Sequence, residues 1–197
     1  MTRFVAIEGL DGAGTTTQAA RLVQVLGSRG RVVVATREPT TGPIGRIIRT
    51  TLRAEVNAPA EATLPWLFAA DRADHLHRTV LPALEEGAFV VTDRYFHSSL
   101  AYQSMSIPLD EVWGLNQGFR VPDVTVFLRV PVDECLRRIG DRQIREIFEE
   151  KSRLDAISAS YERVVGFLRG KGHHIIDIDG TQPQERVAEQ ILAFIEA

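Results

Sequence analysis

The sequence predicts an α/β fold in which a five-stranded parallel sheet is covered by helices on both faces. Five short apolar runs are rich in β-branched residues and too short to be helices, so we interpret them as buried strands. Helical patterns lie between these runs, and such alternation is typical of a parallel sheet. The 197 residues contain no internal repeat, low-complexity segment or long linker, so we expect a single domain over 1–197.

The elements follow one another in regular order along the chain. The predicted strands cover residues 4–7, 32–35, 89–92, 124–128 and 174–178. The helices are predicted to begin near Thr15, Ile44, Ala62, His97, Asp110, Val132, Phe148 and Pro183. Because parallel strands bring their carboxyl ends to one edge of the sheet, we expect ligands to bind at that edge.

The composition argues against several classes of function. Hydrophobic residues make up 44% and charged residues 25% of the chain, as in an ordinary globular domain. The formal charge of −3 is unlike that of a general nucleic-acid binder, which neutralises phosphates with basic residues. Cys135 is the only cysteine, so an intrachain disulfide and a cysteine metal cluster are both excluded. No run approaches the roughly 18 apolar residues of a membrane span. We therefore expect a cytoplasmic protein without a membrane or nucleic-acid partner.

A glycine-rich segment, EGLDGAGTTTQ, follows the first predicted strand and opens the first helix. It matches the phosphate-binding pattern G-x-x-x-x-G-K-[ST], in which backbone amides hold phosphates and the hydroxyl binds Mg²⁺, except that Thr15 stands where the lysine belongs. Only Lys151 and Lys171 of the 23 basic residues are lysines, so a general preference for arginine does not explain a threonine. A plain strand-to-helix turn is the alternative. The predicted phosphate-binding residues are Gly9, Asp11, Gly12, Ala13, Gly14, Thr15, Thr16 and Thr17.

Three further strings stand at the predicted carboxyl edge or between its strands: TREPTTGPIG, LFAADRADHL and TDRYFHSSLAYQ. Together with the glycine-rich segment, they resemble the thymidylate kinase family in order and spacing over residues 4–103. The later strings VPDVTVFLRVP and IREIFEE are similar in position and partly in letters. The resemblance implies a three-layer P-loop NTPase fold like that of nucleoside monophosphate kinases. It also implies transfer of the ATP γ-phosphoryl group to dTMP with Mg²⁺, a place in dTTP synthesis, and a homodimer.

Two helical faces are candidates for binding the acceptor base and sugar. Phe68 and Arg72 are four residues apart, so an aromatic ring and a guanidinium share one side of a helix. On the string alone, we favour the interpretation of Phe68 as a core residue, whereas the resemblance places it against thymine. Ser99, Tyr102 and Gln103 share a polar face of the next helix. The alternative is that this face is a solvated helix surface. The resemblance puts Ser99 and Gln103 near the base and Tyr102 where it would crowd a ribose 2′-hydroxyl.

Charged residues follow the second and third predicted strands, where core packing explains them poorly. Arg37 and Arg94 resemble the arginines that clamp the acceptor phosphate, and the alternative is a set of surface ion pairs. We expect Glu38 and Asp93 to orient these arginines or Mg²⁺-bound water, with Thr16 as a further metal ligand. The resemblance places Asp11 near the sugar 3′-hydroxyl. No general base is required, because a phosphate monoester with a second pKa of about 6 is already ionised at neutral pH.

A cationic segment at about 137–150 resembles the lid that closes on ATP in these kinases. We favour Arg142 and Arg145 as phosphate contacts, which makes them catalytic together with Arg94 and Asp93. Arg137 and Arg138 are candidates for the preceding helix, and a solvated helix is the alternative for the whole segment.

Thr15 and Arg129 depart from the pattern of the family, which usually has lysine at the first position and often an acidic residue at the second. Two hypotheses therefore stand beside an active thymidylate kinase. One is a nucleotide-binding relative that does not transfer phosphate, and the other is a kinase for a different nucleoside monophosphate.

Overall fold

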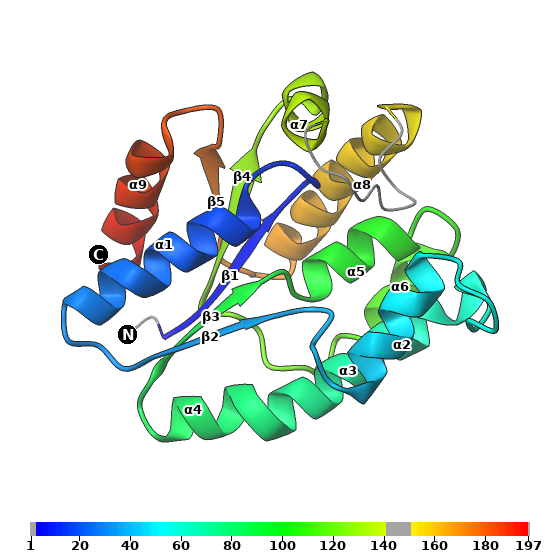
Figure 1. Cartoon of the computed structure of the whole chain (residues 1–197), viewed down its shortest axis with the longest axis horizontal. Coiled ribbons are helices and arrows are strands. Elements are labelled where there is room, and N and C mark those ends of the chain that lie inside the picture. Colours follow the sequence, from blue (N-terminus) through cyan, green and yellow to red (C-terminus); the bar gives the residue numbers. More distant parts are fainter. Residues whose placement is uncertain (1–2, 141–150, 197) are drawn as a thin grey trace.

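The computed structural model describes residues 3–140 and 151–196. Its sheet has five parallel strands in the order β2-β3-β1-β4-β5 (Figure 1). All five predicted strands are present, and each extends one or two residues further toward its carboxyl end than predicted. The strands are β1 (Phe4–Gly9), β2 (Val33–Arg37), β3 (Phe89–Asp93), β4 (Val124–Arg129) and β5 (Ile175–Asp179).

Helices fill the connections as expected. A single 3-10 turn, η1 (Glu61–Thr63), stands near the predicted start at Ala62, and the long helix of the LFAADR string begins directly after it. The start predicted near Phe148 lies outside the described residues. The α-helices are α1 (Thr15–Ser28), α2 (Pro43–Leu52), α3 (Leu64–His75), α4 (Leu81–Glu85), α5 (Phe96–Gln103), α6 (Leu109–Gly114), α7 (Val132–Ile139), α8 (Lys151–Gly170) and α9 (Gln184–Glu196), and the π-helical turn η2 (Leu76–Val80) joins α3 to α4.

The sheet is the middle of three layers. Helices α1 and α9 lie on one face, and α3, α4, α5 and α8 lie on the other (Figure 1). Every residue of β1 and β3 is buried, which explains why both strands are continuous apolar runs. Among the described residues, no helix is apolar over the length that crossing a lipid bilayer requires.

The expectation of a fully buried strand is wrong for β2. Val33 and Val34 are only half-buried, and Ala35 and Arg37 are exposed. The reason is position: β2 stands at the edge of the sheet and pairs with β3 alone. A β-branched run therefore predicts a strand without predicting how fully its neighbours cover it.

The register brings three strand ends together. Asp93 of β3 pairs with Ile7 of β1 on one side and with Arg37 of β2 on the other. The glycine-rich loop leaves β1 at the same edge, so its backbone, Asp93 and Arg37 become neighbours.

Candidate active site

The glycine-rich loop wraps the start of α1, with α7 behind it. Gly12 has a φ of +85°, and a Cβ built there would lie 2.5 Å from the carbonyl oxygen of Cys135 in α7. Gly14 has a φ of +98° and forms the N-cap of α1. A side chain is thus excluded at Gly12 by both conformation and space, because the loop backbone packs directly against α7. Cys135 itself is fully buried, as a core residue of α7.

Thr16 and Asp93 meet at the first turn of α1. The Thr16 hydroxyl donates to Asp93 Oδ2 at 2.6 Å, while Asp93 Oδ1 is buried without a hydrogen-bond partner among the described residues. A hydroxyl and a carboxylate beside a phosphate loop are hard oxygen donors of the kind that Mg²⁺ prefers. Thr15, at the position of the missing lysine, is buried.

Arg137 and Arg138 belong to α7 rather than to a separate lid helix. Arg138 braces the loop from behind, since it donates to the carbonyl oxygens of Ala13 at 3.3 Å and Gly180 at 3.0 Å. Arg142 and Arg145 lie outside the described residues, so their role stays a prediction.

A cavity of about 230 Å³ opens between the loop, α3 and α5. The residues predicted from four separate strings line it together. They are Asp11, Gly12, Gly14, Thr15, Thr16, Thr17, Arg37, Glu38, Phe68, Arg72, Asp93, Arg94, Ser99, Tyr102 and Gln103. Gly9 and Ala13 are not part of the lining and instead shape the loop.

Arg94 occupies one end of this cavity in a left-handed conformation, with a φ of +71°. Its Nη2 donates to Asp11 Oδ1 at 2.5 Å, and its Nη1 donates to the Gly9 carbonyl oxygen at 2.9 Å. The Tyr102 hydroxyl donates to the other Asp11 oxygen at 2.8 Å. Burial, together with the Asp11 charge, raises the pKa of Tyr102 well above its ordinary value, so the phenol stays a neutral donor.

Arg72 lines the same cavity from α3 and is 1% exposed. Its Nε and Nη2 donate to Glu38 Oε2 at 2.9 and 2.6 Å, its Nη2 also reaches Ser99 Oγ at 3.0 Å, and its Nη1 donates to Asn116 Oδ1. His75 Nδ1 lies 3.0 Å from the other Glu38 oxygen. The guanidinium is thereby locked in one plane.

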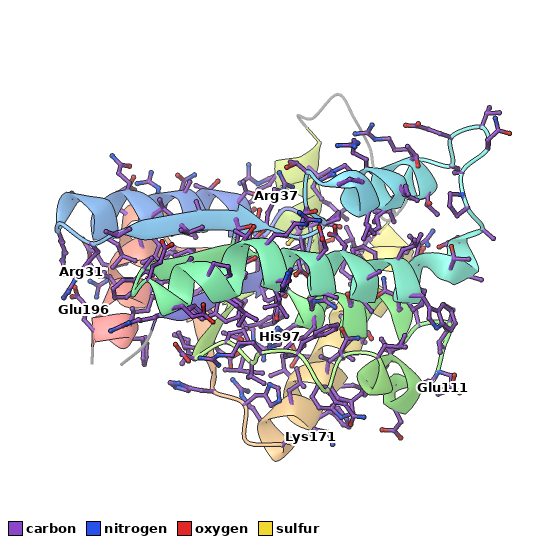
Figure 2. The ribbon with its side chains drawn as sticks, turned by 90° about the horizontal axis from the view of Figure 1, so that it is seen from below. Arg31, Arg37, His97, Glu111, Lys171 and Glu196 are labelled. Carbon is purple, nitrogen blue, oxygen red and sulfur yellow. The ribbon has the colours of Figure 1, made fainter. Side chains whose placement is uncertain are left out.

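This pairing corrects the role expected of Glu38. We expected it to orient Arg37 or Arg94, or to hold metal-bound water, but its carboxylate is shared between Arg72 and His75. Both partners come from α3, and His75 also holds β2, since its Nε2 lies 2.6 Å from the Thr36 hydroxyl. Arg37 remains exposed at the end of β2, near α2 in Figure 2.

The structure also decides two alternatives for the helical faces. Phe68 is half-buried and lines the cavity, so the core interpretation is wrong. Ser99 and Gln103 are 3% and 8% exposed, which contradicts a solvated face. Gln103 Oε1 is buried in this wall without a hydrogen-bond partner in the described part of the chain, and such an atom marks a place where a ligand donor fits.

Sequence reasoning missed several residues that hold the site. Asn116 on the 115–119 turn and Tyr161 on α8 contact the two arginines, yet neither stands in a motif. Glu8 could have been identified from the sequence, since it is a single acidic residue at the end of an apolar strand. It is fully buried, and burial raises its pKa to about 7 against the lowering charge of Arg94.

Comparison with known proteins agrees with this geometry. A model of the thymidylate kinase family matches residues 7–191. A probable thymidylate kinase of Methanococcus aeolicus is 36% identical over 189 residues, which cover 94% of this chain and 92% of the relative. One from Thermococcus kodakarensis is 36% identical and covers 98% and 97%, and one from Thermococcus gammatolerans is 42% identical and covers 75% and 74%. With the phosphate loop, the hydrogen-bonded Arg72 and Arg94 of one cavity and these matches together, the chain belongs to the thymidylate kinase family, whose reaction is the ATP-dependent phosphorylation of dTMP to dTDP.

Proposed function

We propose that the cavity between the phosphate loop, α3 and α5 is the dTMP site of this kinase, and that the loop holds the phosphates of ATP. The single observation that carries the assignment is that one cavity is lined by two different sets of side chains. Arg72, Phe68 and Gln103 form a flat, hydrogen-bonding end, and Arg94 and Arg37 form a cationic end beside the loop. A nucleoside monophosphate has the same polarity, with a base at one end and a dianion at the other.

The base end suits a pyrimidine with carbonyl oxygens. Arg72 has an N–H beyond those bound to Glu38, Ser99 and Asn116, and this group suits a carbonyl oxygen of thymine. Gln103 Oε1, which has no hydrogen-bond partner among the residues that the structure describes, suits a ring N–H, and the Phe68 ring supplies a stacking surface. Glu38 then acts by orienting Arg72 rather than by touching the phosphate.

Between the two ends, Asp11 and Tyr102 face the sugar in this proposal. Asp11 is placed to contact the 3′-hydroxyl, and the Tyr102 ring to crowd a ribose 2′-hydroxyl. Their mutual hydrogen bond fixes both side chains, so the preference for deoxyribose depends on a preformed pair rather than on one residue.

At the phosphate end, Arg94 and Arg37 would bind the acceptor dianion, and Arg142 and Arg145 would contact the phosphates of ATP. Thr16 and Asp93 are the residues that would hold Mg²⁺, and the Asp93 Oδ1 that lacks a partner among the described residues fits that role. The bound ion supplies charge neutralisation of the transferring group. Catalysis by these residues is positioning and charge stabilisation, with no base.

We also propose a cytoplasmic homodimer that contributes to dTTP synthesis. Support for the dimer comes from two large apolar side chains on neighbouring helices, Ile47 on α2 and Trp66 on α3, which are 41% and 57% exposed. Light scattering of the purified chain and of Trp66→Glu tests this proposal, and a monomeric wild-type chain would contradict it.

A coupled assay with ATP and Mg²⁺ tests the substrate assignment against dTMP, dUMP, dCMP, dGMP and AMP. The proposal predicts that dTMP has the highest kcat/KM. Preference for another acceptor would establish a different nucleoside monophosphate kinase. Tight binding of dTMP without turnover of any acceptor would instead establish the non-catalytic relative that Thr15 suggests.

A further inference from the structure

Glu8 carries a buried carboxyl group that does not line the dTMP cavity. It lies near the end of β1, is 0% exposed and is absent from the lining of the dTMP cavity. An acid in that position is costly, because burial disfavours its charge. Its two carboxylate oxygens each accept hydrogen bonds from groups next to Arg94.

One carboxylate oxygen holds the backbone where α5 begins. Glu8 Oε1 accepts from the N–H of Tyr95 at 2.7 Å and from the N–H of Ser98 at 3.3 Å. Tyr95, the N-cap of α5, makes no side-chain capping bond of its own. Glu8 thus supplies the cap from a different strand. Arg94 directly precedes this turn and has the φ of +71°, so the cap also holds Arg94 in a backbone conformation that arginine rarely adopts.

The other oxygen orients two hydroxyl groups. Ser98 Oγ donates to Glu8 Oε2 at 2.7 Å, and the Tyr161 hydroxyl donates to the same oxygen at 3.2 Å. Each hydroxyl has one hydrogen. The two hydroxyl oxygens also lie 2.9 Å apart, so each hydrogen has the other hydroxyl as an alternative acceptor. When both hydrogens point at the ionised Glu8, both oxygens turn lone pairs to Arg94 Nη1, which lies 3.0 Å from Ser98 Oγ and 3.1 Å from the Tyr161 oxygen. They share the two N–H groups of Nη1 with the Gly9 carbonyl oxygen.

We propose that Glu8 is a positioning residue of the kinase reaction, which aims the Arg94 guanidinium at the acceptor phosphate by capping α5 and by fixing the hydroxyl directions of Ser98 and Tyr161. Glu8 touches no substrate, and its effect passes entirely through Arg94. The inference rests on the role proposed above for Arg94. It also ties α8, through Tyr161, to the acceptor site.

The relay requires the ionised form of Glu8. Since Oε1 faces two N–H donors, an added proton sits on Oε2, and one hydroxyl must then turn its own hydrogen away from the carboxyl. The groups that face Glu8 are Arg94 and Tyr95 before α5, His97 on α5 and Tyr161 on α8, with Asp11 across Arg94. Burial lowers the pKa of His97 well below its usual range, so His97 does not compete for this proton near neutral pH.

Glu8→Gln tests the relay, because the amide keeps the shape and the acceptor for the backbone but donates where the carboxylate accepts. We expect kcat/KM for dTMP to fall at least about tenfold at pH 8, from the weakened charged hydrogen bonds, with KM for ATP within about twofold of wild type. The wild-type to variant ratio should shrink toward pH 6. The ionisation of dTMP itself is common to both proteins and cancels in this ratio.

Two results would overturn the proposal. One is wild-type dTMP kinetics in Glu8→Gln at pH 8. The other is a parallel loss of both substrates together with a lower Tm, which would mean a structural role only. Should Glu8→Gln fail to fold, the double variant Ser98→Ala/Tyr161→Phe takes its place, with the same dTMP-specific loss expected and unchanged kinetics overturning the relay.

Ser160→Ala is the matched control, because Ser160 is a buried neighbour of Tyr161 that bonds Ser104 and Arg163 instead. It should leave the dTMP kinetics unchanged. Arg94→Ala, measured in parallel, distinguishes the proposed role of Arg94 from that of Glu8. If Arg94→Ala leaves kcat/KM for dTMP unchanged, the proposed role of Arg94 fails. If Arg94→Ala lowers it while Glu8→Gln leaves it unchanged, only the inference about Glu8 fails.

Discussion

Arg94 is ion-paired to Asp11 across the phosphate end of the cavity, with Nη2 and Oδ1 2.5 Å apart and both side chains largely buried. The guanidinium also binds the Gly9 carbonyl oxygen, so one arginine joins the phosphate loop to the start of α5. An acceptor phosphate that enters here meets a cation already fixed in place. The geometry is that of electrostatic preorganisation, since little reorganisation remains at the moment of transfer.

Arg94→Ala should lower kcat/KM for dTMP at least about tenfold, because a charge-assisted hydrogen bond contributes about 1.5 to 3 kcal/mol. Steady-state kinetics with dTMP as the varied substrate measure the effect. Arg31→Ala, at the far end of the sheet in Figure 2, is the arginine control. Unchanged dTMP kinetics in Arg94→Ala would remove Arg94 from the site.

Tyr102 combines ring bulk with a hydroxyl, and two variants separate them. Tyr102→Phe keeps the ring and loses only the bond to Asp11, so it should preserve discrimination between dTMP and its ribonucleotide. Tyr102→Ala removes the ring and should narrow the ratio of the two kcat/KM values. An alanine variant with the wild-type ratio would show that Tyr102 does not exclude the 2′-hydroxyl.

The stability of the protein should depend on the pH through Glu8. The folded pKa of about 7 lies above the unfolded value of 4.5, so the folded state binds the extra proton between these values and stability falls as the pH rises through that window. Glu8→Gln removes this penalty. Its free energy of unfolding relative to wild type should rise by up to about 3 kcal/mol from pH 5 to pH 8 in urea titrations. A difference that is constant with pH would contradict the assignment.

Glu38→Ala should destabilise the fold by about 3 to 5 kcal/mol, because it leaves the buried Arg72 without its carboxylate. Urea denaturation measures the loss. Glu55→Ala is the control, since Glu55 forms an exposed ion pair with Arg53 and such pairs contribute little. A loss below about 1 kcal/mol in Glu38→Ala would show that Arg72 does not depend on this pair.

The sequence predicted the five strands and the helix order because each rests on a local signal, whereas the residues that line the cavity were proposed mainly from the resemblance of four strings to the thymidylate kinase family. Apolar runs specify buried strands, and the loop and REP strings specify residues at strand ends. The exposure of β2 and the partner of Glu38 were not predictable in that way. The first follows from the position of β2 at the edge of the sheet, and the second from Arg72 and His75 on α3. Both are fixed by chain segments far apart in the sequence.

Tyr161 and Asn116 were not predictable from the sequence for the same reason. Each is an ordinary helical or turn residue by pattern, and each matters only because the fold brings it to an arginine from a different element. Glu8 is different, since an acid that closes an apolar strand stands out in the amino-acid sequence itself. Its role, however, could not be predicted, because it depends on the turn at the start of α5 that Glu8 caps.

Thr15 bears on whether the chain is an active kinase at all. Loss of one preorganised charge contact costs on the order of 10²- to 10³-fold in rate, unless other charges replace it. We expect Arg142 and Arg145 to supply that charge. Arg145→Ala should then reduce kcat strongly, and Thr15→Lys should partly restore it, in a double-mutant cycle with a non-additive result.

The most direct measurement is the turnover of dTMP with ATP and Mg²⁺ by the wild-type chain and by Thr15→Lys, side by side. We expect measurable turnover by the wild-type chain and a change in kcat of less than about tenfold in the variant. Undetectable turnover by the wild-type chain, with ordinary kinase rates in Thr15→Lys, would contradict it. The natural protein would then be a nucleotide-binding relative that has stopped transferring phosphate.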